Sequence, residues 1–306
     1  MTAALFFEQL LNGLQLGMTL FLMSAGLTLV FGVMGLINLA HGSLYMIGAF
    51  CCAWITNLTD SFLLGLVAGF VGAAIAGLII EIIVIRKLYD RNHLDQVLAT
   101  FALILIISEG TSWIFGSSPL YLSIPSWLSG SVSLWGGASY PIYRLVIIAL
   151  GLHIAYGLYL LITKTRLGMR IRAGESDREM IAALGVDIRT IYTLVFALGA
   201  ALAGLAGSLV STLYSVEVGM GEPVLILALV VIVIGGIGSV KGALIASILV
   251  GLVDTLGRVF LPNILSLLVD NDNVATVSAS LASVLVYILM AVILAIRPQG
   301  LFPANA

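Results

Sequence analysis

Nine long apolar segments, separated by short polar loops, restrict what this chain can fold into. A helix needs about 20 mostly apolar residues to cross the hydrocarbon core of a bilayer, whereas the strands of a membrane barrel would alternate polar and apolar residues. The sequence therefore predicts an all-α polytopic membrane protein, organised as a single transmembrane domain over residues 1–306. The nine segments are residues 10–34, 38–57, 62–85, 97–116, 142–163, 191–214, 223–240, 242–260 and 275–296.

The number of helices depends on the N-terminal part of the chain. The stretch 32–48 is rich in glycine and polar residues, and it carries no basic residue to mark a side of the membrane. One broken or re-entrant helix there would change the count, so we expect eight to ten transmembrane helices with broken or re-entrant segments. Residues 1–13 contain no Lys or Arg, so this end lacks the basic region of a secretory signal and is expected to be retained.

Composition excludes several classes of soluble protein. Hydrophobic residues make up 61% of the chain and charged residues 9%, whereas an ordinary soluble domain carries about 25% charged residues. The chain has too little polar surface for a soluble enzyme or a disordered protein. It also lacks the basic surface of a nucleic-acid binder, so we expect membrane lipid, and no nucleic acid, among its partners.

The basic residues predict how the chain is oriented. If the nine segments cross the membrane in turn, eleven of the 13 Lys and Arg residues fall on one side. Only Arg144 and Arg258 fall on the other. The positive-inside rule then places residues 86–96, residues 164–190 and the C-terminus in the cytoplasm, and the N-terminus outside. The eleven are Arg86, Lys87, Arg91, Lys164, Arg166, Arg170, Arg172, Arg178, Arg189, Lys241 and Arg297.

No catalytic or cofactor motif is present in the sequence. There is no nucleophile elbow and no zinc-protease motif, and Cys51 and Cys52 have no His or Asp at ligand spacing. The glycine-rich run at residues 235–242 lacks the spacing of a phosphate-binding loop. We therefore expect no catalytic residue, no metal and no cofactor, and no hydrolysis of ATP by the chain alone.

Several polar residues interrupt the apolar segments and are candidates for a translocation pathway. A charge at the centre of a bilayer costs at least about 2.5–3.5 kcal/mol, so such residues usually face a cavity or a partner. Glu109 has no basic residue one helical turn away; it either faces a pathway or partner, or is a structural acid bonded to Ser or backbone groups. Asp254 and Arg258 are four residues apart and can pair, which we interpret as mainly structural. The pathway candidates are Asn12, Gln15, Asn38, His41 and Glu109.

Glycines cluster in two places, at residues 32–48 and 235–242. Transporters often break helices in corresponding halves of the chain, exposing backbone groups to the substrate. The alternative is ordinary close packing of helices through small residues. The predicted backbone breaks are Gly42, Gly235, Gly236 and Gly238.

The loop 164–190 is the one long polar stretch on the predicted cytoplasmic side. Six basic and four acidic residues fall within its 27 positions. Acidic residues near the start of Glu175–Leu184 favour a short amphipathic helix, which Gly185 would end. Ile181 and Leu184 could form an apolar ridge that inserts into another protein; the alternative is a solvated connector.

The same segments resemble the permeases of bacterial high-affinity branched-chain amino-acid ABC importers. The early motif is GLINLAHGSLYMIGA at 35–49, in a form that points to the shorter of the two usual permeases. RAGESDREMIAALGV at 172–186 is similar to their cytoplasmic coupling loop, although it lacks the Glu and the Leu-Pro of the wider ABC signature. FALGAALAGLAG at 196–207, VIGGIGSVKGA at 233–243 and RPQGLF at 297–302 follow in the expected order.

This resemblance implies an inner-membrane importer with several partners. A second homologous permease would share the pathway, P-loop ATPases would dock on the cytoplasmic side, and a periplasmic binding protein would deliver the substrate. The expected substrates are leucine, isoleucine or valine, although related systems carry other amino acids, urea, amides or aromatic acids. The alternatives are an ATP-independent secondary transporter or channel, in which Glu109 and His41 would be the one available pair, and a membrane scaffold. The expected ATPase-coupling residues are Arg172, Glu175, Asp177, Ile181, Ala182, Leu184 and Gly185.

Overall fold

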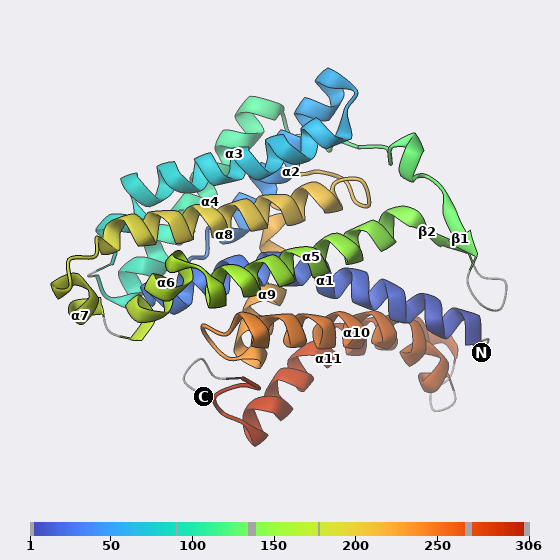
Figure 1. Ribbon diagram of the computed structural model, residues 1–306. Helices are drawn as coiled ribbons and strands as arrows, with labels where there is room; N and C mark the ends of the chain where they lie inside the picture. Colours follow the sequence, from blue (N-terminus) through green and yellow to red (C-terminus); the bar gives the residue numbers. More distant parts are fainter. Residues whose placement is uncertain (1–2, 90, 134–138, 177, 267–270, 303–306) are drawn as a thin grey trace.

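The computed structural model describes residues 3–89, 91–133, 139–176, 178–266 and 271–302 (Figure 1). Within these residues most of the chain is helical. Each of the nine predicted apolar segments coincides with one helix, which confirms the all-α polytopic prediction. These helices are α1 (Ala3–Met34), α2 (His41–Thr59), α3 (Phe62–Ile83), α4 (His93–Phe115), α5 (Ile142–Lys164), α8 (Ile188–Val210), α9 (Gly221–Gly235), α10 (Val240–Leu265) and α11 (Asn271–Ile296).

Six of these helices, α1, α3, α4, α5, α8 and α10, are long and apolar enough to cross a membrane by length and composition. The shorter elements lie in the connections between helices. Their bounds are η1 (Ile85–Lys87), η2 (Ser126–Leu128), β1 (Ser131–Ser133), β2 (Ser139–Pro141), α6 (Arg166–Ser176) and α7 (Arg178–Ala183). β1 and β2 form a small antiparallel hairpin in which Ser131 is opposite Pro141.

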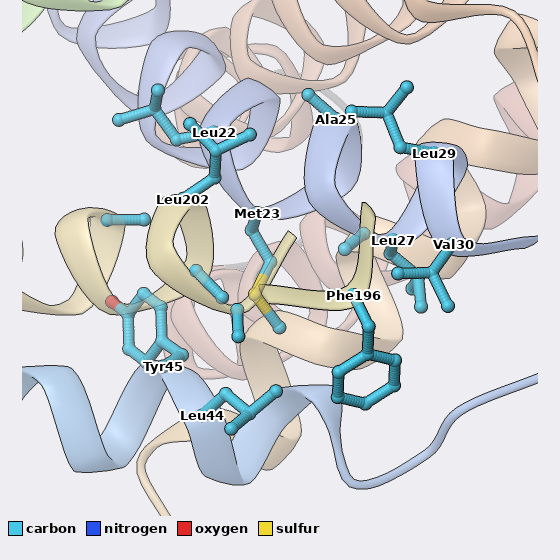
Figure 2. Packing of buried hydrophobic residues seen from close by; sticks show 14 of the residues in the cluster. Leu22, Met23, Ala25, Leu27, Leu29, Val30, Leu44, Tyr45, Phe196 and Leu202 are labelled. Atoms are coloured by element: carbon cyan, nitrogen blue, oxygen red, sulfur yellow. The ribbon is translucent and has the colours of Figure 1, made fainter. Parts of the chain in front are cut away.

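The core is built around α1 and α8, the two most deeply buried of the six spanning helices. Figure 2 shows side chains of α1, α8 and α2, among them Met23, Phe196 and Leu44, turned toward one another. By contrast α3, α4 and α5 expose many apolar side chains; Trp113 of α4, for instance, is 89% exposed. Because the chain is apolar both inside and outside, burial divides its helices into a central pair and a periphery that suits lipid or a partner subunit.

Glycine pairs bring the central helices into backbone contact. A Cβ atom added to Gly48 of α2 would lie 2.2 Å from the Cα atom of Gly204 in α8. One added to Gly26 of α1 would lie 2.5 Å from the carbonyl oxygen of Gly199 in α8. Such contacts leave no room for a side chain, so the glycines permit the close helix packing that is common in membranes.

Two helices begin inside the packed chain. α1 ends at Met34, residues 35–40 are not helical, and α2 starts at His41, which is fully buried. α9 starts at Gly221 in direct contact with α2, because a Cβ atom on Gly221 would lie 1.9 Å from the carbonyl oxygen of Gly42. A non-helical segment thus separates α1 from α2 directly before His41 and Gly42.

The second glycine cluster lies where one helix ends and the next begins. Gly235, Gly236 and Gly238 form a tight turn between α9 and α10, where Gly235 packs against Gly242. The segment that corresponds to 35–40 is 211–220, which leads from α8 to the buried start of α9. The packing agrees with this correspondence, since α1 packs most extensively on α10 and α8 on α3. An internal repeat that relates α1–α3 to α8–α10 would give this packing.

Replacing Gly48 by Ala should destabilise the protein, because the new methyl group would overlap the backbone of Gly204. We expect a loss of about 1–3 kcal/mol, the usual cost of overpacking a core. Thermal unfolding of the purified chain in detergent measures this. Gly157→Ala in α5, where a Cβ atom meets nothing within 4 Å, is the matched control and should leave the unfolding temperature unchanged or raise it. Equal unfolding temperatures for both variants would contradict the packing account.

Candidate translocation and coupling sites

A polar cavity of about 360 Å³ lies between α1, α5 and α10, with the end of α8 and the start of α9 closing it. Its wall includes Gln9, Asn12 and Thr19, which recur along one face of α1 at helical spacing. Gln15, which is 8% exposed, also lines it. Two of the five predicted pathway residues, Asn12 and Gln15, therefore share one cavity.

Hydrogen bonds and an ion pair organise this cavity. The side-chain amide of Asn12 donates to the Oε1 atom of Gln9 over 3.2 Å, and Arg144 of α5 donates to the Oδ1 atom of Asn12. In α10, the Nε atom of Arg258 donates hydrogen bonds to both carboxylate oxygens of Asp254, at 3.0 and 2.9 Å. The expected pairing of Asp254 with Arg258 is confirmed, and the structure adds that the pair belongs to a cavity wall.

A larger cavity, of about 650 Å³, adjoins the same three helices together with α6. Its wall is mainly apolar, with Leu29 and Val33 from α1 and Tyr156 from α5. Gly238 and Arg172, two residues singled out from the sequence, also line it. Figure 1 shows α1 lying between α5 and α10. The first part of α1 lines the polar cavity, and its later part lines the apolar one.

The other predicted pathway residues do not join this site. Asn38 and His41 are buried at the break before α2, where the Oδ1 atom of Asn38 accepts a hydrogen bond from the backbone of Ala40 at 3.1 Å. Glu109 is exposed on α4, and it lines neither of the two cavities described above. Because His41 is fully buried and Glu109 lies on the outer surface of a peripheral helix, the pair suggested for an ion-driven carrier is not assembled.

The predicted coupling segment forms two short helices, α6 and α7, at the end of the molecule opposite the N-terminus (Figure 1). Gly185 ends α7 with a φ of +82°, as predicted for a left-handed helix stop. Arg172 folds back and donates to the carbonyl oxygen of Ile162 in α5. Asp177 lies outside the described residues, as does the side chain of Glu175.

The structure places only one of the two residues predicted for an apolar ridge, Leu184, on the surface. Ile181 is 5% exposed, so its side chain packs into the chain itself. Leu184 is 75% exposed and Met180 is 59% exposed. The exposed residues of this segment are therefore Met180 and Ala182 of α7, together with Leu184 and Gly185, which follow the helix.

A buried acidic residue that the sequence reading missed fixes the base of this region. Glu81 of α3 is 0% exposed and accepts hydrogen bonds from Arg86 at 2.9 Å and from the Tyr89 hydroxyl at 2.7 Å. The hydroxyl of Thr193 in α8 donates to Glu81 over 2.9 Å. Burial, followed by the hydrogen bond to Glu81, raises the pKa of Tyr89. The signal was present in the sequence, since Glu81 is a lone acid in an apolar run with Arg86 five residues later.

This cluster ties α3 to the first turns of α8, immediately after the coupling segment. Asp187 caps α8 by accepting from the backbone of Arg189 at 3.0 Å and from the Thr190 hydroxyl. The hydroxyl of Thr190 beside it lowers the pKa of Asp187. A displacement of α7 would therefore reach a helix that is fixed to α3 by a buried charge.

Comparisons with known proteins agree with the sequence motifs. The family model described as the permease component of branched-chain amino acid transport systems matches residues 9–294. The high-affinity branched-chain amino acid transport system permease protein BraD of Pseudomonas aeruginosa is 31% identical over 266 residues, covering 82% of this chain and 86% of that protein.

Two further relatives carry the same description. The permease protein LivH of Salmonella typhimurium is 31% identical over 272 residues, and LivH of Escherichia coli K12 is 30% identical over 278 residues. Each alignment covers 84% of this chain and 87% of the relative. No solved structure matches this chain.

Removing Arg86 should harm the protein more than removing Glu81. Arg86→Leu leaves the fully buried Glu81 carboxylate without its cation, and an uncompensated buried charge is strongly destabilising. Glu81→Leu leaves an arginine whose side chain is 34% exposed and can turn to water. Thermal unfolding of the two single variants and of the double variant measures the difference. The double variant should recover most of the loss, and equal losses in the two single variants would contradict this account.

Proposed function

This chain belongs to the family of permease components of branched-chain amino acid transport systems, and we propose that it moves branched-chain or related amino acids across a bacterial inner membrane by alternating access. As an ABC importer permease it is a multi-pass membrane protein that is not itself catalytic. The observation that carries the proposal is the polar cavity between α1, α5 and α10, set among helices that are otherwise apolar. A membrane scaffold would have no need of such a cavity.

The energy for transport would come from partner subunits. Two P-loop ATPases would dock on α6 and α7, a second homologous permease would complete the pathway, and a periplasmic binding protein would deliver the substrate. ATP binding must favour the inward- and outward-facing states differently, or no net transport results. The exposed patch of Met180, Ala182, Leu184 and Gly185 suits such a docking surface. Its position after α5 and before the central helix α8 would carry a displacement into the core.

The orientation follows from charge. The ends of α3, α5 and α11, and the turn between α9 and α10, lie at the same end of the molecule as α6 and α7 (Figure 1). Eleven of the 13 basic residues belong to these segments. We therefore infer that this end and the C-terminus are cytoplasmic, that the polar cavity opens to the periplasmic side, and that residues 1–306 act as one transmembrane domain.

Replacing Gly185 by Val should uncouple the assembled transporter. A φ of +82° strains any β-branched residue, so the end of α7 would change shape. We expect uptake to fall about tenfold or more while ATP hydrolysis continues, since a coupling loss of about 1.4 kcal/mol already corresponds to a factor of ten. Proteoliposomes that contain all subunits measure both rates. Gly174→Ala in α6, where a Cβ atom meets nothing within 4 Å, is the control, and normal uptake by the Gly185→Val variant would count against the coupling role.

Affinity purification of the tagged chain from native membranes in mild detergent should bring its partners with it. We expect a second permease and one or two kinds of P-loop ATPase, identified by mass spectrometry. If the ATPase docks on the exposed surface of α6 and α7, a charge placed there should weaken its binding. A chain carrying Leu184→Asp should therefore copurify with less ATPase than the wild type. Recovery of the chain alone, or only with copies of itself, would contradict the importer assembly and favour an ATP-independent carrier.

A further inference from the structure

Arg144 and Arg258, the two basic residues that depart from the positive-inside pattern, line the same polar cavity. They come from different helices, α5 and α10, and lie far apart in the sequence. Arginine in a membrane helix is costly unless it faces water, a partner or a ligand. The positive-inside rule, which explains the other eleven basic residues, does not explain why these two arginines lie in one cavity.

The cavity carries an excess of positive charge. Among the described residues in its wall, the charged side chains are Arg144, Arg258 and Asp254, which sum to one net positive charge. Asp254 is 7% exposed, and Arg258 holds it through Nε and Nη2. This geometry leaves the Nη1 end of the guanidinium outside the pair, on a side chain that is 55% exposed.

The remaining wall is divided between amides and hydrocarbon. Gln9, Asn12 and Gln15 supply neutral donors and acceptors from α1. Leu16, Leu20, Val224 and Leu227 supply an apolar side. The volume of about 360 Å³ falls near the lower limit of the roughly 300–1,000 Å³ typical of small-molecule sites. The cavity therefore suits a small ligand that has both a charged end and an apolar end.

We propose that this cavity is a transient binding station for a free α-amino acid, in which Arg144 and Arg258 hold the carboxylate. Guanidinium groups match the planar geometry of a carboxylate. Asp254 and the amide oxygens of Gln9 and Gln15 line the same cavity and are the acceptors for the ammonium group, and the leucine and valine side chains contact the substrate's hydrocarbon. This inference rests on the proposed transport function and narrows its substrates to carboxylates, excluding urea and simple amides. The binding is weak, because a pathway must release what it binds.

The same arginines could instead contact a binding protein that docks on the periplasmic face. The geometry favours the small ligand, because the charges line a concave wall that includes the nearly buried Asp254. A docking surface would need them on the outer loops.

Chemical labelling of a cysteine in the cavity wall tests the proposal. Thr255 lines the cavity, so Thr255→Cys would be placed in a chain whose Cys51 and Cys52 are replaced by Ala. The full transporter in vesicles is treated with sulfonatoethyl methanethiosulfonate, which is anionic, or with its cationic trimethylammonium analogue. We expect the anionic reagent to react about tenfold faster, relative to the ratio measured for a free thiol, because a cationic cavity concentrates anions.

Ligand protection identifies the group that is recognised. Leucine at about 1–10 mM, the range of a weak site, should slow the labelling, whereas leucinamide, which lacks the carboxylate, should not. Arg144→Gln should abolish both the anion preference and the protection. Arg91→Gln, which removes an exposed arginine outside the cavity, is the matched control and should change neither. The Arg144→Gln chain must elute as the wild type does on size exclusion, which separates this effect from misfolding.

The outcomes separate this inference from the proposed function. Equal labelling by the two reagents, or equal protection by leucine and leucinamide, would overturn the carboxylate station even if the wild-type transporter imports leucine. The proposed binding of an amino acid in the cavity would also be overturned by a second result: the binding protein no longer activates the Arg144→Gln transporter, while leucine still protects the cysteine as in the wild type. Failure of the wild-type transporter to import any amino acid would overturn the proposed function itself.

Discussion

Backbone contact between glycines is the interaction on which the rest of this structure depends. Gly26 meets Gly199, Gly48 meets Gly204 and Gly42 meets Gly221, and these contacts hold α1, α2, α8 and α9 as one unit. Non-helical backbone at membrane depth is tolerated only where protein or a water-filled cavity surrounds it. The segment 35–40, in which no residue is exposed, meets this condition because the central helices pack so closely. The fold can therefore start α2 in its interior, with other helices covering the non-helical backbone before it.

The polar cavity is a consequence of the same packing. α10 lies against α1 through Gly13, Gly17 and Gly251, which brings the backbones close near the start of α1. The long side chains of Arg258 and Arg144 then converge on the amides of α1 from two sides. On the opposite end of the molecule, the Glu81 cluster fixes α3 to α8 next to α7. Substrate contact and coupling to the ATPases would thus occur at opposite ends of the central helices α1 and α8.

Much of this organisation could be predicted from the sequence. Segment length and hydropathy predict all nine helices, with ends that differ from the observed ones by up to seven residues. A glycine after an amphipathic run predicts the helix stop at Gly185. Asn12 and Gln15 line a cavity, as expected for polar residues in apolar helices. Whether an individual side chain points into the core or toward the surroundings could not be predicted so well. In a membrane protein both the core and the surroundings are apolar, so periodicity does not separate them, and Ile181 and Glu109 were therefore misplaced or left open. The spacing of Asp254 and Arg258 predicts their pairing, but their convergence with Arg144 on one cavity exists only in the folded chain.

The most direct test of the central claim is uptake of radiolabelled leucine into proteoliposomes that contain the chain with its copurified partners. ATP would be supplied on the side of α6 and α7, or withheld while a proton gradient is imposed. The account predicts accumulation of leucine that requires ATP and the binding protein and ignores the proton gradient. Accumulation driven by the gradient without nucleotide, particularly by the purified chain alone, would contradict the claim that this protein is an importer permease powered by separate ATPases.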